Sequence, residues 1–406
     1  MNCNPQLRFK EFGGEWKDTF LKELLSFKNG LNASKEKYGK GIKFINVLDI
    51  LENSYINYDK ILDSVDATDE QIENYNVSYG DVVFQRSSET REEVGLTNVY
   101  LDKNKDCIFG GFVIRGKKIA NYNPFFLKVL LSTSTIRKEI TSRSGGSTRY
   151  NIGQNSLEKI EIHLPTIEEQ KKIAIFLLNL DEKIAILKEK LMKWELFKKG
   201  IMQHLFSQEL RFKDKNDKNY PMWEEKKLNE IGEIITGNTP PTKNQENFSE
   251  TGFLWVTPTD IGNHKYVHST ERKLTEKGIE KGRFIPKNCV LVTCIASIGK
   301  NCILPENGSC NQQINSIIPF NMFNYEFIYY LMENNVNKLK SFAGITATPI
   351  LNKNDFGELI FKFPILKEQV KIAEFLDNID EKINDLENKL EKANKFKKGL
   401  LQKMFC

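Results

Sequence analysis

The 406-residue sequence lacks any uninterrupted apolar run close to the roughly 20 residues that a membrane-spanning helix requires. Its first residues, Met1 to Pro5, also lack the apolar core of a signal peptide. We therefore expect a cytoplasmic protein that has no contact with a membrane. The length allows two or three domains that each bury a core of their own. A hydrophobic fraction of 40% and a charged fraction of 28% are ordinary for a soluble globular protein.

Histidine and cysteine are scarce, and neither shows the spacing of metal ligands. Histidine occurs at only four positions, His163, His204, His264 and His268. Four of the seven cysteines lie near one another in the sequence, without a C-x-x-C pair, at Cys289, Cys294, Cys302 and Cys310. We therefore expect no metal site, and we interpret these cysteines as small core residues of strands rather than zinc ligands.

Motifs of the common enzyme classes are also missing. The segment Ser297 to Asn301 ends like a phosphate-binding P-loop, but Cys294 stands where the first glycine belongs and Asn301 replaces Ser or Thr. The segment Asn123 to Phe126 is similar to the Asn/Asp-Pro-Pro-Tyr/Phe motif of amino-methyltransferases, but it lacks the second proline. No glycine-rich cofactor loop lies near it. These absences predict a chain without catalytic residues.

What the sequence does contain is a long internal repeat. Pro165 to Phe206 aligns without a gap with Pro364 to Phe405 at a constant offset of 199, and 23 of the 42 aligned positions are identical. A chain that repeats such a segment is built as two related halves. Its function should therefore need two related sites at a fixed separation.

The repeat continues weakly before each copy. The tetrapeptide Leu7 to Lys10 recurs as Leu210 to Lys213, and a tryptophan follows in each half, Trp16 and Trp223. Between these anchors the two halves diverge, which predicts one scaffold presenting two different recognition surfaces. We place the domain boundaries at 1–164 for a first domain, 165–208 for a central helix, 209–363 for a second domain and 364–406 for a C-terminal helix.

Each repeated segment has the apolar pattern of a helix that pairs with another helix. Apolar residues recur at alternating steps of four and three, which is the 3.5-residue seam of a coiled coil. The predicted pairing residues are Ile173, Leu177, Leu180, Ile184, Leu187 and Leu191 in the first copy and Ile372, Leu376, Ile379, Ile383, Leu386 and Leu390 in the second. Two antiparallel helices of about 35 residues would form a spacer about 50 Å long. The alternative is that each helix lies on the core of its own domain.

Glycines interrupt both helical patterns near their ends. Gly200 and Gly399 occupy equivalent positions of the repeat. Because glycine costs about 1 kcal/mol inside a helix, these positions predict a kink or a stop.

The sequences between the helices predict mixed α/β domains with short strands. Helices are predicted over 124–141 and 324–340, at equivalent places in the two halves. Each is followed by a loop rich in small and hydroxyl residues, over 141–150 and 342–349. The first loop contains arginines, hydroxyl groups and exposed amides, which are groups that contact phosphates and base edges of nucleic acid.

Several polar residues in these loops and in two further segments have side chains suited to DNA. Arginine pairs with guanine and Asn or Gln with adenine, so such residues can read bases. The DNA-contacting residues that we predict are Arg86, Ser88, Arg91, Arg143, Ser147, Thr148 and Arg149 in the first half, and Lys300, Asn311, Gln312, Gln313, Thr346 and Thr348 in the second. The alternative for each is a solvated polar residue without a partner. The net charge of +5 permits a nucleic-acid partner without requiring one.

The repeated helices carry an E-Q-x-K-I-A-x-F-L-x-x-x-D-E-K-I block and end with F-K-K-G-x-x-Q-x-x-F. This arrangement, over the whole chain, resembles the specificity subunit of type I restriction-modification systems. The resemblance implies an α+β fold, with two pseudo-repeated mixed α/β target recognition domains separated by two long antiparallel coiled-coil helices. It further implies that each domain reads one half of a bipartite, asymmetric site on double-stranded DNA, and that the helices fix the spacer between the half-sites.

Partners and cofactors also follow from this resemblance. The helices would dock two methyltransferase subunits that hold S-adenosylmethionine, and two restriction subunits that use ATP and Mg would join them. The chain itself would hold no cofactor and would not be an enzyme. Two other functions are left open: a coiled-coil scaffold that binds protein rather than DNA, and a stand-alone enzyme, which the missing motifs disfavour.

Overall fold

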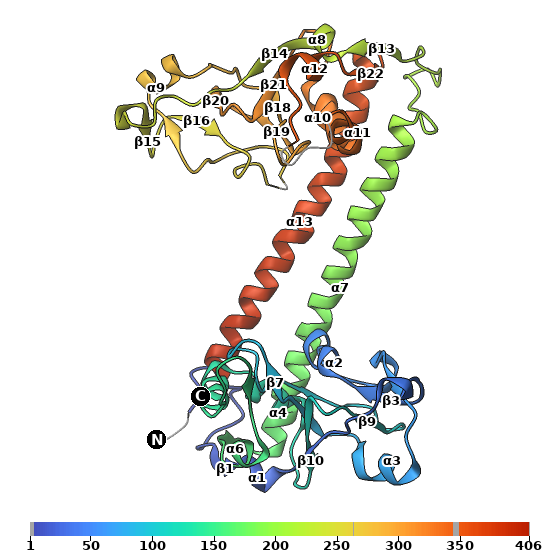
Figure 1. The fold of residues 1–406 in the computed structure, drawn as a ribbon, viewed down its shortest axis with the longest axis vertical. Coiled ribbons are helices and arrows are strands. Elements are labelled where there is room, and N and C mark those ends of the chain that lie inside the picture. The colour runs from blue at the N-terminus through green and yellow to red at the C-terminus, as the bar shows by residue number, and fades with distance from the viewer. Residues whose placement is uncertain (1–3, 263, 344–348, 406) are drawn as a thin grey trace. The chain divides into compact units, whose positions relative to one another are not determined.

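The computed structural model describes residues 4–262, 264–343 and 349–405, and it divides into two compact units. The first unit comprises residues 1–188 and 388–406, and the second comprises residues 189–387. Two long helices, α7 (Ile167–Phe206) and α13 (Leu366–Met404), pack together (Figure 1). Each unit contains the beginning of one long helix and the end of the other, so the two helices run antiparallel, as predicted.

In the first domain, the first strand pairs with the last strand. The elements before α7 are β1 (Lys17–Phe20), α1 (Leu21–Leu24), β2 (Leu25–Asn29), η1 (Lys35–Lys37), β3 (Tyr38–Ile45), α2 (Val47–Glu52), η2 (Tyr58–Lys60), β4 (Ser64–Val65), α3 (Asp69–Tyr75), β5 (Asn76–Val77), β6 (Val82–Gln85), β7 (Ser87–Ser88), β8 (Thr97–Val99), β9 (Cys107–Phe109), β10 (Val113–Lys118), α4 (Pro124–Leu131), α5 (Ser134–Ser142), β11 (Tyr150–Asn151), α6 (Gln154–Glu158) and β12 (Glu161–Leu164). Their main sheet has the order β2-β10-β6-β8 and is antiparallel throughout. A second sheet, β4-β3-β9-β5, contains the parallel pair β3 and β9.

The second domain repeats the main sheet and the parallel pair of this topology although its sequence differs. Its elements are β13 (Glu224–Lys227), α8 (Leu228–Ile231), β14 (Gly232–Thr236), η3 (Gln245–Asn247), β15 (Phe248–Ser249), β16 (Phe253–Val256), β17 (Lys273–Leu274), α9 (Glu276–Lys281), β18 (Cys289–Thr293), β19 (Asn301–Leu304), β20 (Gly308–Cys310), β21 (Ile314–Pro319), α10 (Tyr325–Asn334), α11 (Val336–Phe342), α12 (Lys353–Gly357) and β22 (Ile360–Phe363). The main sheet is β14-β21-β18-β19, and the other sheet is β15-β17-β16-β20 with the parallel pair β16 and β20. The first and last strands pair in both domains, β1 with β12 and β13 with β22. The predicted scaffold with two unlike surfaces is therefore one fold used twice.

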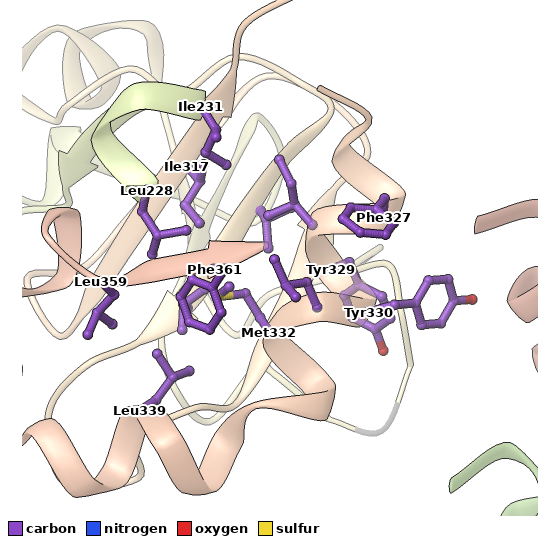
Figure 2. Close-up of a cluster of buried hydrophobic side chains, with 14 of the residues drawn as sticks. Leu228, Ile231, Ile317, Phe327, Tyr329, Tyr330, Met332, Leu339, Leu359 and Phe361 are labelled. Atoms are coloured by element: carbon purple, nitrogen blue, oxygen red, sulfur yellow. The ribbon is translucent and has the colours of Figure 1, made fainter. Parts of the chain in front are cut away.

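The core of the second domain lies between its main sheet, α10, α11 and the start of α13. Leu228, Ile317, Phe327 and Leu339 converge there from four different elements (Figure 2). These side chains are fully or almost fully buried, and burying each contributes roughly 1.5–3 kcal/mol. A matching core in the first domain gathers residues of α4, α5 and the start of α7.

The repeated Glu-Gln pair near the start of each long helix forms the joint between helix and domain. Arg8 binds Glu169 through two hydrogen bonds, Nε to Oε1 at 2.8 Å and Nη2 to Oε2 at 2.7 Å. Arg211 binds Glu368 in the same way, at 3.2 and 2.8 Å. Both carboxylates are buried, and Glu169 raises the pKa of Arg8 through these hydrogen bonds. This pair explains why Leu7 to Lys10 recurs in the sequence together with the helix motif.

The neighbouring glutamine connects the same helix to the middle of its domain. Gln170 accepts a hydrogen bond from the Asn123 backbone N–H at 2.9 Å, and its Nε2 donates to the Pro165 carbonyl at 2.9 Å. Gln369 repeats both contacts with Asn324 and Pro364, each at 2.8 Å. The side chain of Asn123 caps α4 by accepting from the Phe126 N–H. The Asn123–Phe126 motif is therefore a helix start and not a remnant of a methyltransferase site.

The last phenylalanine of each repeat packs into a cluster of aromatic rings. Phe405, at the end of α13, packs on Trp16 and Phe126 in the first unit. Phe206, at the end of α7, packs on Trp223 and Phe327 in the second. Each domain therefore binds the beginning of one long helix and the end of the other through the same residue types.

All twelve predicted pairing residues of the helices are buried or half-buried. Ile173 and Leu177 also belong to the core of the first domain, and Ile372, Leu376 and Ile379 to that of the second. The first turns of each helix thus lie on their own domain, as the alternative interpretation expected. Pairing of the remaining residues across the two helices stays a prediction.

An ion pair joins the two helices within each unit. Lys198 binds Asp380 at 2.8 Å in the second unit, and Lys397 binds Asp181 in the first. The four residues are two equivalent pairs at the offset of 199. The repeated Asp-Glu-Lys-Ile and Phe-Lys-Lys-Gly sequences therefore supply the two ends of the same contact.

Two details of the predicted helices are wrong. The helix expected over 124–141 breaks between α4 and α5, because the hydroxyl groups of Ser132 and Thr133 donate to carbonyls one turn back, each at 2.7 Å. In the second domain Asn335 donates to the Leu331 carbonyl at 2.8 Å at the equivalent break. A stop at the glycines is also wrong, since both long helices continue through them, whereas a kink there stays a prediction. No neighbouring atom would obstruct a side chain at either glycine.

Three of the four clustered cysteines lie in strands as predicted, whereas Cys294 is buried in the loop after β18. Cys289, Cys302 and Cys310 are buried in β18, β19 and β20, and burial raises the pKa of the Cys310 thiol to about 12. Among the described residues, no group of His, Cys, Asp or Glu side chains could hold a metal ion. In the same part of the chain, no helix combines the length and the apolarity that crossing a membrane requires.

Candidate functional site

Three loops meet at one end of the main sheet in the first domain. They are the loop after β6, the turn between β9 and β10 at 110–112, and the segment that precedes α6. The Arg86 N–H donates to the Phe112 carbonyl at 2.8 Å, and the Arg86 carbonyl accepts from the Ile152 N–H at 3.0 Å. Arg86 thus joins the three loops through its backbone. We call this surface the first three-loop edge.

The second domain forms the same edge from different residues. The Cys294 N–H donates to the Gln313 carbonyl at 2.8 Å, and the Cys294 carbonyl accepts from the Leu351 N–H at 2.8 Å. Here the loops are the one after β18, the turn between β20 and β21 at 311–313, and the segment before α12. We call this surface the second three-loop edge. Because backbone groups make these contacts, the two domains form the same edge with different side chains.

One glycine in each domain allows the turn to approach closely. A Cβ atom on Gly30 would lie 2.0 Å from the Gly110 carbonyl oxygen, and one on Gly237 would lie 2.2 Å from the Cys310 carbonyl oxygen. Neither backbone atom can move aside without breaking the sheet. Equivalent glycines therefore allow the backbone to approach each turn equally closely.

The structure brings two predicted segments of the first half together. Strands β7 and β11 pair, with Ser88 opposite Tyr150, so the loop after β6 lies beside the loop over 141–150. Arg91 donates to the Thr141 carbonyl at 3.2 Å across these loops. Arg149 lies 3.9 Å from Glu89, and both side chains are largely exposed. The predicted residues at this edge therefore form one surface rather than separate loops.

The remaining predicted residues of the first half differ in their freedom to contact a ligand. Ser147 and Thr148 are exposed, and Arg143 forms an exposed ion pair with Glu139 at 2.9 Å. Ser88 is buried: its hydroxyl donates to Glu93 at 2.8 Å and accepts from the Thr90 N–H. The Ser88 hydroxyl therefore stabilises its own loop and is not exposed to a ligand.

Arg86 lies beside a shallow cavity of about 530 Å³ at the first three-loop edge. Its Nη1 donates to the Gly111 carbonyl at 3.3 Å, which leaves the other nitrogens of the guanidinium group available. The cavity is polar, with lining residues Asn29, Arg86, Asn151, Ile152, Gly153, Gln154, Asn155 and Ser156. Such a lining suits hydrogen bonding to base edges or phosphates.

In the second half, the predicted amides lie on the turn itself. Gln312 accepts a hydrogen bond from the Thr239 hydroxyl at 2.6 Å, and the Gln313 Oε1 accepts from Asn311 Nδ2 at 3.0 Å. Asn311 is buried, whereas Gln312 is exposed. Lys300 is exposed in the loop that follows β18. Thr346 and Thr348 lie outside the described residues.

The sequence reasoning missed two residues at the first edge. Phe112 is 63% exposed on the turn, and Arg137 lies behind the loop after β6. Arg137 donates to three carbonyls of that loop, those of Glu92, Val94 and Gly95. Burial lowers its pKa to about 10. Only the glycine pair before Phe112 signalled a tight turn in the sequence.

Comparison with known proteins places this double architecture in a family. A family model for the type I restriction modification DNA specificity domain matches the chain twice, at residues 13–195 and 221–394. The chain belongs to this specificity-domain family. The two matches correspond to the two domains with the adjoining long helices.

Two curated members of the specificity family from Methanocaldococcus jannaschii are similar in sequence. The specificity subunit of the type I restriction enzyme MjaIX is 31% identical over 207 residues, which are 49% of this chain and 48% of that protein. The aligned region thus spans about half the length of that relative. A putative MjaX specificity subunit is 25% identical over 409 residues, covering 96% of this chain and 93% of that protein.

Solved structures of specificity subunits share the fold. The S subunit of a type I restriction-modification system from M. genitalium has a TM-score of 0.62 at 16% identity, covering 99% of both chains. A chain from a study of complex assembly in a type I restriction-modification system has a TM-score of 0.57, also at 16% identity, with 95% of both chains covered. At this identity the likeness establishes the fold of two repeated domains and two long helices.

Proposed function

We propose that this chain is the non-catalytic specificity subunit of a type I restriction-modification complex. Each domain binds one half of a bipartite, asymmetric site on double-stranded DNA. The observation that carries this proposal is the three-loop edge, which two domains of one fold build from the same backbone contacts and different side chains. Two identical edges would suit a symmetric sequence, whereas unlike edges suit two different half-sites.

The chemistry of the two edges supports DNA as the ligand. The first edge carries arginines, of which Arg86 and Arg149 can reach guanine or phosphate. The second edge carries Gln312 and Gln313, whose amides can pair with adenine, and Lys300 as a phosphate contact. We assign Arg91, Arg143, Ser147 and Thr148 to phosphate contacts of the first half-site, and Asn311, Thr346 and Thr348 to the second.

The long helices fix the spacer of unread base pairs and provide the docking surface for two methyltransferase subunits. Those subunits hold S-adenosylmethionine, and two restriction subunits supply ATP- and Mg-dependent cleavage in the cytoplasm. The reciprocal ion pairs, Lys198 with Asp380 and Lys397 with Asp181, support two equivalent docking surfaces. This chain contributes no cofactor and no reacting group.

A four-residue insertion near Glu189 tests the spacer role. It lengthens α7 by about 6 Å, which corresponds to at most about two base pairs at about 3.4 Å each. Sequencing of methylated bases in a host that carries the complex should then show both half-sites unchanged and a longer gap between them. A four-residue replacement at the same place, which keeps the length, is the control and should leave the gap unchanged.

Two results would contradict the proposal. One is an insertion that alters the half-sites while the gap stays the same. The other is a wild-type complex that shows no salt-dependent binding to duplex DNA, because a protein that neutralises phosphates releases counterions and its affinity falls steeply with salt. The second result would favour a scaffold that binds protein.

A further inference from the structure

The turns at 110–112 and 311–313 are equivalent residue by residue. The Gly30 N–H donates to the Val113 carbonyl at 3.1 Å, and the Gly237 N–H donates to the Ile314 carbonyl at 3.0 Å. Together with the contacts of Arg86 and Cys294 to the turns, these bonds place Phe112 and Gln313 at the same position. The two domains therefore present one residue each at a matched point of their edges.

Phe112 is an apolar side chain at a polar edge. Its ring is 63% exposed although the adjoining strand β10 begins with the buried residues Val113 and Ile114. It lies next to Gly111, whose carbonyl accepts from Arg86 Nη1 at 3.3 Å. At this position, beside an arginine of the candidate interface, the exposed ring is available to contact a ligand.

Gln313 is held by a buried neighbour. Asn311 Nδ2 donates to the Gln313 Oε1 at 3.0 Å, and Asn311 Oδ1 accepts from the Gln313 N–H at 3.0 Å. The Oε1 atom keeps a second lone pair, and the described residues provide no acceptor for Nε2. The amide is thus oriented with one donor and one acceptor available, the pair that adenine requires in the major groove.

We propose that this turn reads one A·T base pair in each half-site. Phe112 packs on the C5-methyl group of thymine in the first half-site, and Gln313 forms two hydrogen bonds with adenine in the second. The Phe112 ring has no group that can bind a phosphate, and the Gln313 amide presents the donor and acceptor that adenine requires. This inference rests on the proposed function and assigns a specific position within it.

Phe112→Ser is the first test, in the complex of this chain with its methyltransferase subunits. The site is first identified by sequencing methylated bases, and duplexes carrying each of the four base pairs at every half-site position then compete for the complex. Phe112→Ser should lose roughly fivefold or more of the preference for A·T at one position of the first half-site. Phe112→Leu keeps an apolar contact with the methyl group and should restore that preference.

Two variants complete the design. Ile119→Ser is the matched control, because Ile119 is 57% exposed at the opposite end of β10 and should leave every position unchanged. Gln313→Ala is the reciprocal variant. It should lose roughly 5- to 150-fold of the adenine preference at one position of the second half-site, with the first unchanged.

The inference is overturned if Phe112→Ser keeps the wild-type preference at every position of the first half-site. It is also overturned if the variant weakens all duplexes equally, since that result assigns Phe112 to the backbone or to folding. A wild-type complex that fails to modify an asymmetric two-part site would overturn the proposed function itself, before any variant is compared, and this inference with it.

Discussion

The two domains agree in the contacts that hold each long helix and differ in the side chains around those contacts. Arg8 and Arg211 bind their glutamates with the same pair of atoms, and Gln170 and Gln369 bridge the same two backbone groups. Around the helix ends, however, Lys128 in the first domain occupies the place of Tyr329 in the second. The equivalent half-buried cations also differ, Arg137 in one domain and Lys338 in the other.

This difference separates two kinds of structural constraint. Joints made by side chains, such as Arg8 with Glu169, persist in the sequence because each partner requires the other. Edges made by backbone groups, such as the contact of Arg86 N–H with the Phe112 carbonyl, impose no residue identity. A duplicated chain can therefore change what its edges recognise without loosening the helices that place them.

The largest loss of stability is expected when the arginine of the buried Arg–Glu pair is removed in one unit only. Arg211→Ala leaves the Glu368 carboxylate buried without a cation, which should destabilise the second unit by about 3–5 kcal/mol. Arg8→Ala should have an effect of the same size in the first unit. Hydrogen exchange of the Phe327 and Phe126 amides reports the two units separately.

The control for this comparison is an exposed ion pair of the second unit. Lys226 binds Glu224 at 2.8 Å at the surface, and Lys226→Ala should leave stability almost unchanged, because solvent screens an exposed ion pair. Unequal losses from Arg8→Ala and Arg211→Ala, or a loss no greater than that of Lys226→Ala, would show that the two joints are not equivalent.

The next largest effect should be a difference between the two domains in how their stability depends on pH. Burial lowers the pKa of Lys128 to about 8, and the nearby Lys397 lowers it further while Asp181 opposes this. The unfolded chain then holds more protons than the folded one between about pH 8 and 10.5, so stability rises with pH in that window and the full penalty applies below it. At pH 7, Lys128→Met should therefore stabilise the first unit by about 2–3 kcal/mol.

The measurement is urea unfolding of wild type and Lys128→Met at pH 7 and pH 10. The advantage of the variant should shrink as the pH rises, because the folded wild-type lysine loses its charge above about pH 8 while the unfolded chain still binds that proton. Tyr329→Met in the second domain is the matched variant, and its effect should not shrink with pH, because burial raises the pKa of Tyr329 and so makes the wild type less stable, not more, as the pH approaches 10. A constant advantage for Lys128→Met would mean that packing, and not charge, determines the effect.

The sequence predicted the repeated helices, the antiparallel pair and the mixed domains because their determinants are side chains. The periodic apolar residues from Ile173 onward and the recurring Leu-Arg-Phe-Lys tetrapeptide are visible without a structure. Asp49 and Asp260 occupy equivalent places after β3 and β16, and each accepts from a backbone N–H three residues earlier at 2.8 Å. These residues make the same bond in both domains.

The equivalence of the two edges could not be predicted in this way. Phe112 and Gln313 share a position but no chemical property, and only backbone hydrogen bonds reveal the match. The helix breaks at Thr133 and Asn335 could not be predicted from the sequence, because side-chain hydrogen bonds to carbonyls compete with the helix only in a particular rotamer. Ser88 looked like a surface hydroxyl in the sequence, and its burial depends on the pairing of β7 with a distant strand.

A smaller effect is expected at Arg137 and at Lys338, the equivalent residue of the second domain. Arg137 donates to three carbonyls of the loop after β6, while Lys338 donates to one, that of Ile360 at 2.6 Å. Arg137→Lys cannot reproduce three bonds from one nitrogen, and it should cost about 1–2 kcal/mol. Lys338→Arg should stay within about 0.5 kcal/mol of wild type. Thermal unfolding of both variants gives the comparison, and equal losses would mean that the number of carbonyl contacts does not matter.

The smallest effect should be the same in both units. Gly200 and Gly399 lie inside long helices, and a Cβ atom at either position would have no neighbour within 4 Å. Glycine in a helix interior costs about 0.5–1 kcal/mol relative to alanine, so Gly200→Ala and Gly399→Ala should each stabilise the chain by that amount. Because the two sites lie in different units, the double variant should gain the sum, about 1–2 kcal/mol, in urea unfolding of the isolated chain. A gain at one glycine and a loss at the other would show that the repeated helices, despite their shared sequence, are not equivalent in their environment.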